Sequence, residues 1–441
     1  MSDMTKVITY GTYDLLHYGH IRLLKRAKEL GDYLIVGVTA DDFDKARGKI
    51  NVQQSLMERI EAVRATGLAD KIIVEEYEGQ KIDDIRRYGV DIFTVGSDWK
   101  GKFDYLNEFC KVIYLDRTDG ISSSELRAEQ QSLRLGIVGT SPVVEKYITE
   151  SKYVNGVEAI NAQYPQYGLG DDKDSLQNGY SYLLKQVDAV YIGSSPKHHY
   201  WQICQALKSG KHVLCEAPIA LTEKQSLELF KVAQDNNCVL MDAIKTAYSM
   251  AYSRLLLLLK EGIIGDIYSV DATCTSLRNL SNNSWDSICE WGPTALLPVF
   301  DILGTTYKAK QIVSHMDDQK KDLFTRVTFV YEHAVASVKV GTGVKSEGEL
   351  IVSGTKGYVY VPAPWWKMEY FETRYEDSSK NRRYFYQLDG EGIRYELVSF
   401  LQTIRKGKKE SYIRKNVSSE ICGIIEDFYL SLIHISEPTR H

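Results

Sequence analysis

The chain has 441 residues, and its 54 Lys and Arg against 59 Asp and Glu give a net charge of −5. Nucleic acids require clustered positive charge, so this composition argues against them as partners. The hydrophobic content of 44% is ordinary for a globular protein, and the length favours roughly three compact units. No apolar run approaches the ~20 residues that cross a membrane, and no signal peptide is evident. We therefore expect a cytoplasmic protein outside the membrane.

The cysteines carry no metal-binding or disulfide pattern. Seven of them are scattered along the chain without a CxxC pair or a neighbouring histidine ligand. We therefore expect free thiols and predict no metal site.

The first predicted elements are a strand over residues 7–10, a glycine turn and a helix that begins at His17 and His20. Backbone N–H groups and a helix N-terminus at such a turn favour an anionic phosphate. Two imidazoles three residues apart share one helix face, so both can donate hydrogen bonds to the same triphosphate. The pattern indicates nucleotidyl transfer, although an isolated pair of this kind could equally cap and pack the helix.

A second segment, RTDGISSS at residues 117–124, follows a predicted strand over 111–115. It offers a guanidinium, a glycine turn and three hydroxyls where another helix is expected to start. Together with GTYDLLHYGH at 11–20, it resembles the cytidylyltransferase family typified by glycerol-3-phosphate cytidylyltransferase, over residues 1–131.

This resemblance implies a Rossmann-like nucleotidyltransferase domain and a set of site residues. The phosphate of a small polyol phosphate, most simply glycerol phosphate, would attack the α-phosphorus of CTP, with Mg²⁺ held largely by the phosphates. The implied catalytic residues are His17, His20, Lys49 and Arg117. The implied nucleotide contacts are Gly11, Thr12, Tyr13, Asp14, Asp98, Thr118, Gly120, Ile121, Ser122 and Ser123. Arg47 and Arg59 would hold the substrate phosphate.

Three positions depart from the family pattern. Arg47 replaces a lysine, Ser97 replaces the first of two aspartates, and a second family arginine is absent around Gly67. These departures affect the identity of the acceptor more than the chemistry. Adenylyl-transferring relatives share the HxGH element, so ATP in place of CTP stays an alternative.

A polar stretch ends at residue 132, and a new predicted strand over 133–139 begins a second region. Strands at 187–193 and 212–214 alternate with helices at 200–209 and 224–236, which predicts a doubly wound parallel sheet over 132–250. Period-2 alternation at 267–276 and 325–361 predicts an α+β open-sheet domain over 251–430. Residues 431–441 break the helical pattern of 421–430, and we expect this tail to be non-native.

The second region resembles the glucose-fructose oxidoreductase and inositol dehydrogenase family through segments 188–200, 210–218 and 262–267. The resemblance implies an NAD(P)-binding Rossmann domain. Candidate dinucleotide contacts are Gly136, Gly139, Thr140, Ser141, Ser194, Pro196, His199 and Glu216.

The residues that would carry redox chemistry are altered in this region. Ala217 stands at the family lysine, while Pro298 and Ile302 replace an Asp and a His. Substitute proton donors are Lys245, Tyr248 and His199, although each also has an ordinary structural explanation. Two hypotheses stay open: a reductase that makes the polyol phosphate, or a retired binding or dimerisation module. The expected partners are small-molecule substrates and a second copy of the chain in a homodimer.

Overall fold

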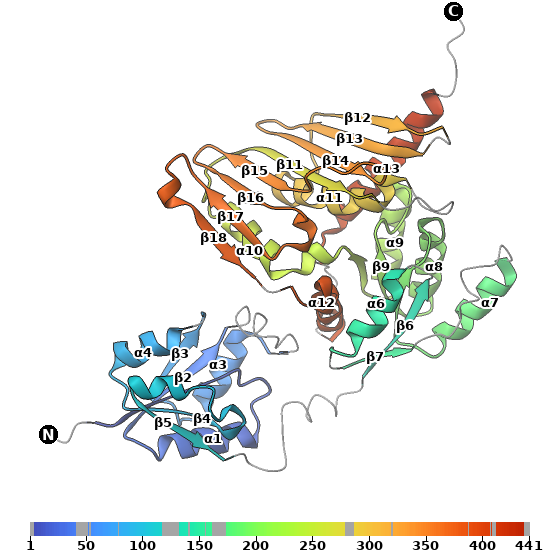
Figure 1. Ribbon diagram of the computed structural model, residues 1–441. Helices are drawn as coiled ribbons and strands as arrows, with labels where there is room; N and C mark the ends of the chain where they lie inside the picture. The colour runs from blue at the N-terminus through green and yellow to red at the C-terminus, as the bar shows by residue number, and fades with distance from the viewer. Residues whose placement is uncertain are drawn as a thin grey trace, which may run out of the picture. The chain divides into compact units, whose positions relative to one another are not determined.

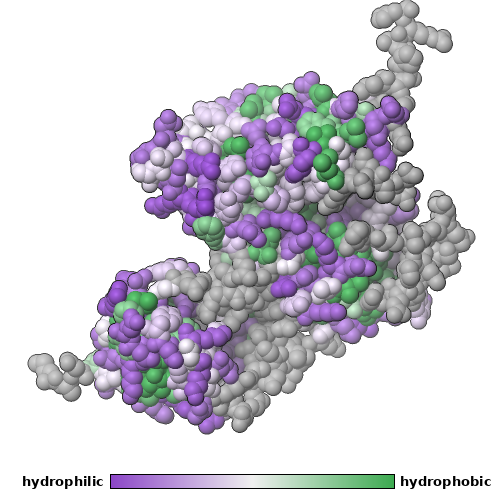
Figure 2. All heavy atoms as spheres, viewed as in Figure 1, coloured by the Kyte–Doolittle hydropathy of each residue, from purple (hydrophilic) through white to green (hydrophobic). Residues whose placement is uncertain are grey.

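The structure is a computed structural model that describes residues 4–40, 52, 54–77, 79–116, 132–139, 142–154, 156–160, 173–277, 286–318, 321–386, 388–405, 407 and 412–435 (Figure 1). The chain divides into two compact units, unit 1 from Met1 to Ser132 and unit 2 from Leu133 to His441. Across the described ranges no helix is both long and apolar enough to cross a membrane. Hydrophilic side chains cover most of the coloured surface in Figure 2. All seven cysteines are free.

Unit 1 is built on a parallel sheet of five strands in the order β3-β2-β1-β4-β5. The strands are β1 (Lys6–Gly11), β2 (Tyr33–Thr39), β3 (Lys71–Glu75), β4 (Ile92–Gly96) and β5 (Lys111–Leu115). The helices are α1 (Tyr18–Lys28), α3 (Leu56–Ala65) and α4 (Gln80–Tyr88), with the short 3₁₀ helices η1 (Ser97–Trp99) and η2 (Asp104–Glu108). Val7 and Ile8 of β1 belong to separate cores on opposite faces of the sheet, because successive side chains of a strand alternate.

The strand order of unit 1 reverses beside β1. Chain order runs outward from β1 through β2 to β3 on one side, and through β4 to β5 on the other. Connections that leave in opposite directions open a crevice at the carboxyl ends of the strands, where such sheets bind ligands. The loop between β1 and α1 starts at this crevice.

Unit 2 begins with the expected doubly wound parallel sheet, in the order β10-β9-β8-β6-β7. Its strands are β6 (Leu133–Gly139), β7 (Val157–Ile160), β8 (Ala189–Gly193), β9 (His212–Glu216) and β10 (Leu240–Ala243). Its helices are α6 (Pro142–Ser151), α7 (Lys173–Leu184), α8 (Pro196–Lys208) and α9 (Glu223–Asp235). Every residue of β8 is buried, as expected for a central strand covered on both faces.

The rest of unit 2 contains a mixed sheet of eight strands in the order β12-β13-β14-β11-β15-β16-β17-β18. They are β11 (Ile267–Thr275), β12 (Ala309–Met316), β13 (Asp322–Val330), β14 (Val335–Gly341), β15 (Leu350–Gly354), β16 (Tyr358–Val361), β17 (Tyr370–Arg374) and β18 (Arg382–Phe385). Strands β12, β17 and β18 lie outside the two predicted segments. The other helices are α10 (Met250–Lys260), α11 (Ser287–Leu303), α12 (Ile393–Arg405) and α13 (Lys415–Ile435).

Two C-terminal helices join the sheets of unit 2. Helix α13 packs on α9 and also on α11, and α12 packs on α6. The boundary expected at residue 250 therefore falls inside one compact unit. The expectation that the helix breaks after residue 430 was wrong, because α13 continues to Ile435. No Gly or Pro follows Leu430 before Pro438 in the sequence, so nothing local stops the helix there.

Candidate active site

The two histidines of unit 1 lie together at the start of α1. His17 is the N-cap residue, and its Nδ1 accepts a hydrogen bond from the Gly19 N–H at 3.1 Å. The rings of His17 and His20 stack with centroids 3.9 Å apart and planes 27° apart. Because Nδ1 of His17 is an acceptor here, the neutral ring carries its proton on Nε2. The expected pairing of the imidazoles on one face is therefore present.

The loop that leads to these histidines is held in an uncommon conformation. Tyr13 and Leu15 have φ values of 53° and 48°, a left-handed region that non-glycine residues seldom adopt. Gln54 ties the loop down: its N–H donates to Asp14 Oδ1 at 2.9 Å, and its Oε1 accepts from the Leu15 N–H at 2.8 Å. Tyr13 and Asp14 are both buried and support the loop. Their direct contact with a nucleotide stays a prediction.

Arg59 connects three segments behind the same loop. It lies on α3, which begins with a capping box between Ser55 and Glu58. Its guanidinium donates to the carbonyls of Thr12 at 2.6 Å, Thr39 at 2.8 Å and Gln54 at 3.1 Å. The side chain is fully buried. In this structure Arg59 fixes the ends of β1 and β2, and its predicted contact with a substrate phosphate stays a prediction.

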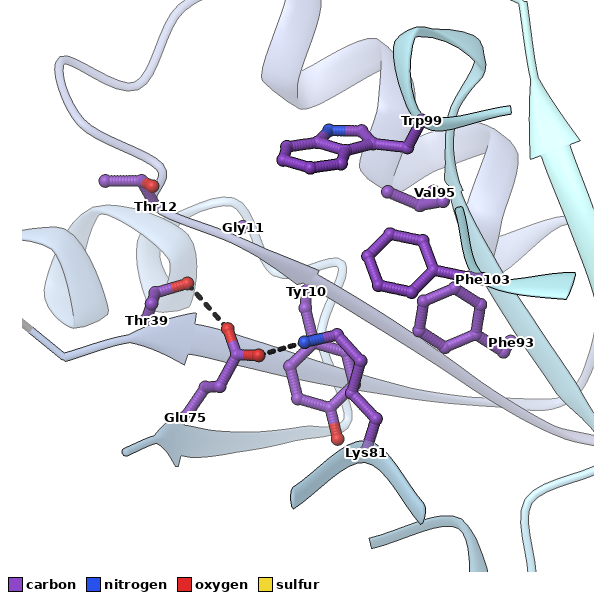
Figure 3. Close-up of a pocket in the computed structure, with 10 residues that line it drawn as sticks. All are labelled: Tyr10, Gly11, Thr12, Thr39, Glu75, Lys81, Phe93, Val95, Trp99 and Phe103. Carbon is purple, nitrogen blue, oxygen red and sulfur yellow. Dashed lines mark hydrogen bonds and ion pairs between the residues drawn. The ribbon is translucent and has the colours of Figure 1, made fainter. Parts of the chain in front are cut away.

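A pocket lies at the carboxyl ends of the strands, next to this loop. Its lining residues are Tyr10, Gly11, Thr12, Thr39, Glu75, Lys81, Phe93, Val95, Trp99 and Phe103 (Figure 3). Gly11 ends β1 and Thr12 begins the histidine loop, so the pocket shares a wall with the predicted nucleotide site. Sequence reasoning named only these two of the lining residues.

The polar part of the pocket is a buried ion pair. Lys81 of α4 bonds to Glu75 at the end of β3, and their side chains are 10% and 1% exposed. Thr39 Oγ1 donates to the other carboxylate oxygen of Glu75 at 2.9 Å. The Tyr10 hydroxyl donates to Asp84 at 2.9 Å, and burial raises the pKa of Tyr10. In the sequence, Glu75 follows the short apolar run 72–74, and a lysine stands six residues later; this is the only local signal for the pair.

The remaining predicted residues of unit 1 divide into two groups. Asp98 lies in η1, directly after β4, and is exposed beside the pocket residue Trp99. Outside the described residues lie Arg47, Lys49, Arg117, Thr118, Gly120, Ile121, Ser122 and Ser123. The residue before Arg117 is described: the Asp116 carbonyl accepts a hydrogen bond from Arg26 of α1 at 2.8 Å. The helix that starts at the histidines therefore also holds the approach to the second motif.

In unit 2 the first strand, β6, ends at Gly139. Gly139 has a φ of 131°, and a Cβ there would lie 2.3 Å from the Gly193 carbonyl oxygen. This close approach of β6 and β8 fits the backbone that a dinucleotide requires at this position. Thr140 and Ser141 lie outside the described residues. At Gly136 an added Cβ would meet core side chains, which indicates a packing role.

Two of the three candidate proton donors of unit 2, His199 and Tyr248, are buried, and Lys245 is half-buried. The ring nitrogens of His199 lie 2.7 Å from the Pro218 carbonyl and 2.9 Å from the Ser194 carbonyl, and burial lowers its pKa. The Tyr248 hydroxyl is buried and donates to the Asp242 carbonyl at 2.6 Å. These contacts favour the structural explanation of both side chains.

Two stacked tyrosines join helix α6 to the central strand β8. Tyr147 of α6 and Tyr191 of β8 have ring centroids 3.7 Å apart. Tyr191 donates to Glu216 at 2.6 Å, and Tyr147 donates to Glu396 of α12. Burial raises the pKa of Glu216 and raises that of Glu396 to about 8. Sequence reasoning missed Tyr147 and Glu396, which are 249 residues apart.

Two further predicted residues, Ser194 and Pro196, lie near the start of α8. The Ser194 hydroxyl donates to Gln202 at 2.5 Å, and Pro196 is in the first turn of the helix. Within the described parts of both units, no three His, Cys, Asp or Glu side chains gather in a way that could hold a metal ion.

Comparison with known proteins separates the same two regions. The cytidylyltransferase-like family matches residues 8–129, and the oxidoreductase family with an NAD-binding Rossmann fold matches residues 133–243. The glycerol-3-phosphate cytidylyltransferase of Bacillus spizizenii is 50% identical over 130 residues, which are 30% of this chain and 100% of that protein. The Staphylococcus aureus enzyme of the same name is 48% identical over 130 residues, 29% of this chain and 95% of that protein.

Unit 2 has more distant relatives. A trans-1,2-dihydrobenzene-1,2-diol dehydrogenase of Xenopus laevis is 24% identical over 272 residues, covering 57% of this chain and 80% of that protein. The crystal structure of KijD10, a 3-ketoreductase from Actinomadura kijaniata in complex with NADP and TDP-benzene, superposes with a TM-score of 0.57. It is 17% identical and covers 67% of this chain and 96% of that one. The second region thus has an oxidoreductase-like fold.

Proposed function

Because the chain belongs through its first unit to the glycerol-3-phosphate cytidylyltransferase family, we propose that this nucleotidyltransferase couples CTP to a small polyol phosphate. The simplest acceptor is glycerol phosphate, and the products are a CDP-polyol and pyrophosphate. The observation that carries the proposal is the stacked pair His17 and His20, beside a pocket at the carboxyl ends of the sheet. A phosphate-rich reaction needs donors and positive charge fixed at one place. The two imidazoles can donate here, and the Arg59 guanidinium lies behind the same loop.

The proposed reaction is a single in-line displacement. A phosphate oxygen of the acceptor bonds to the α-phosphorus of CTP while the bond to the bridging oxygen breaks, and pyrophosphate leaves with that electron pair. Mg²⁺ enters as part of the nucleotide substrate, held by phosphate oxygens. The imidazole N–H groups of His17 and His20 stabilise the charge on the phosphoryl oxygens, and Arg59 keeps the loop in position.

Pyrophosphate release tests this proposal. The full chain is mixed with Mg²⁺, CTP or ATP, and a panel of polyol phosphates. We expect release with CTP and at least one polyol phosphate, and much slower release with ATP. If no acceptor yields pyrophosphate with CTP, the proposal is refuted, and a preference for ATP would reassign the base.

For unit 2 we propose a binding module that has lost its redox activity. Ala217, Pro298 and Ile302 stand where the resembled family has ionisable side chains, and His199 and Tyr248 are enclosed by backbone contacts. NAD(P)H would supply a hydride when bound, and the backbone at Gly139 and Gly193 fits such a group. The competing candidate is a reductase that makes the polyol phosphate from a keto or aldehyde precursor, with Lys245 as its proton donor.

Titration with NADH and NADPH separates these candidates. Binding raises the melting temperature of unit 2 by mass action, whereas turnover would oxidise the nucleotide in the presence of a phosphorylated aldehyde or ketone. We expect no oxidation above background. Oxidation that is lost in Lys245→Met but kept in the exposed variant Lys356→Met would establish the reductase instead.

A further inference from the structure

A second cavity lies in unit 2, between the C-terminal ends of α7 and α8. The two helices pack through Tyr180, whose hydroxyl donates to the Gln202 carbonyl at 2.9 Å and whose ring centroid lies 5.5 Å from that of Trp201. The cavity has a volume of about 330 Å³, within the range of about 300–1,000 Å³ that is typical of small-molecule sites. Its lining residues are Ser181, Leu184, Lys185, Gln205, Ser209 and Lys211.

This cavity is separate from the edge of the sheet that fits a dinucleotide. Lys185 directly follows α7, Ser209 is the C-cap of α8, and Lys211 directly precedes β9. The strands of this sheet are parallel, so the residue before β9 lies at their amino ends. Gly139, at the end of β6, lies at their carboxyl ends. The cavity is therefore on the opposite edge of the sheet.

The polar lining of the cavity has an excess of positive charge. It contains the ammonium groups of Lys185 and Lys211 and no Asp or Glu. Lys211 acts on Asp188 only beyond ion-pair distance, and that carboxylate already bonds to the Arg134 N–H at 3.0 Å and to its guanidinium at 3.4 Å. Positive charge without a matched carboxylate favours an anionic ligand, and a phosphate group is a strong hydrogen-bond partner of ammonium groups.

Gln205 adds a buried acceptor to this lining. Its Oε1 is buried and has no hydrogen-bond partner among the described residues. Ser209 lies one helical turn further along α8, where its N–H donates to the Gln205 carbonyl at 3.0 Å, so both residues lie on the same side of the helix. Lysines at the ends of two helices would by themselves only balance the helix dipoles. A buried oxygen without a donor is costly, however, and a ligand hydroxyl would remove that cost.

We propose that this cavity binds a small phosphorylated molecule that also bears hydroxyl groups. Lys185 and Lys211 bind the phosphate, and Gln205 Oε1 accepts a hydrogen bond from a ligand hydroxyl. Leu184, which is buried, forms the apolar part of the wall. The inference rests on the binding role proposed for unit 2 and gives that role a class of ligand.

Equilibrium dialysis of the full chain, without CTP or NAD(P)H, tests the site with three probes. Glycerol 3-phosphate offers a phosphate and hydroxyls, sulfate offers charge alone, and glycerol offers hydroxyls alone. The double variant Lys185→Met with Lys211→Met should lose one bound equivalent of glycerol 3-phosphate per chain, while any binding in unit 1 stays the same. At the site that this variant lacks, we expect glycerol 3-phosphate to bind about 10-fold more tightly than sulfate or glycerol.

Gln205→Leu separates recognition of the hydroxyl from recognition of the charge. It removes the acceptor, so binding of glycerol 3-phosphate should weaken by about 3-fold to 10-fold while sulfate binding stays within about 2-fold. The matched control is Lys208→Met, because Lys208 is exposed in the last turn of α8 and does not line the cavity. We expect wild-type binding from that control.

Unchanged binding in the double variant, or an equal loss in Lys208→Met, would overturn the inference. Sulfate that binds as tightly as glycerol 3-phosphate would overturn the class of ligand. Because neither CTP nor NAD(P)H is present, these outcomes leave the proposed transfer and the proposed loss of redox activity standing. Failure of either of those proposals would be seen in its own assay, as missing pyrophosphate or as oxidised nucleotide.

Discussion

Both units begin with a strand that ends at a glycine and is followed by a helix, yet the polar side chains near the ends of these strands differ in exposure. In unit 1 the imidazoles of His17 and His20 stack at the helix start and are only partly buried. In unit 2 the His199 ring is fully buried and lies against two backbone carbonyls. Tyr147 donates to the buried carboxyl group of Glu396, and Tyr191 donates to the half-buried one of Glu216. Two units with a similar arrangement of strand and helix therefore need not share an activity, because activity depends on accessible donor groups at the site.

Removal of an imidazole from unit 1 should have the largest effect. His17→Ala is expected to lower kcat for pyrophosphate release by about 100-fold to 1000-fold, because a donor to the phosphoryl oxygens is lost. The matched control is Tyr18→Phe, which changes an exposed residue of the same helix turn. We expect wild-type rates from that control and similar melting curves from both. Undiminished turnover in His17→Ala would mean that the transfer site lies elsewhere.

The next largest effect is a loss of stability expected on substitution of Gly139, the last residue of β6 in unit 2. Gly139→Ala forces a side chain into a φ of 131° and to 2.3 Å from the Gly193 carbonyl oxygen, so we expect a loss of about 2–4 kcal/mol in the stability of unit 2. Gly210→Ala is the control: its φ is 72°, but nothing lies within 4 Å of the added Cβ, and about 1 kcal/mol should be lost. Denaturant melts of the full chain measure both.

These melts also bear on the comparison between units. Transferase activity should survive Gly139→Ala under conditions where unit 2 stays folded, since Gly139 belongs to unit 2 and the histidines belong to unit 1. If pyrophosphate release falls together with the stability of unit 2, the two units are energetically coupled.

Local patterns predicted the parts of this protein whose contacts are close in sequence. The strand, turn and helix around His17 were predictable because the turn, the cap and both imidazoles lie within fifteen residues. The pair Glu75 and Lys81 was missed because the pocket that it lines also needs Tyr10 and Phe103, which the fold brings together from other strands and loops. Strand β12 was missed because its residue types do not follow its burial: Val313 is exposed, whereas Lys310 and Ser314 lie on the half-buried face, so hydrophobic and polar residues do not alternate.

A third prediction concerns pH and the enclosed carboxyl group of unit 2. The folded pKa of Glu396 is about 8 against an ordinary 4.5, so the folded state keeps this proton where the unfolded chain has released it. Between about pH 4.5 and 8 the stability of unit 2 therefore falls as the pH rises. Glu396→Gln does not titrate, and its loss of stability from pH 5 to 8 should be smaller by about 1–3 kcal/mol.

Urea unfolding of the full chain at the two pH values measures this difference. The exposed variant Glu376→Gln serves as control and should keep the wild-type profile. Equal pH profiles for Glu396→Gln and the wild type would show that this carboxyl group is open to solvent. The contrast between an accessible site in unit 1 and an enclosed one in unit 2 would then fail.

The smallest effect compares one kind of helix cap in both units. Ser55 caps α3, and Thr222 caps α9 by accepting from the Gln225 N–H at 3.1 Å. Ser55→Ala and Thr222→Ala should each lower stability by about 1 kcal/mol, because each leaves a helix N–H without its side-chain acceptor. Only α3 carries Arg59, which holds the Thr12 carbonyl beside the histidine loop. We therefore expect Ser55→Ala, and not Thr222→Ala, to slow pyrophosphate release by about 2-fold to 5-fold; equal rates would mean that the loop holds its shape without help from the start of α3.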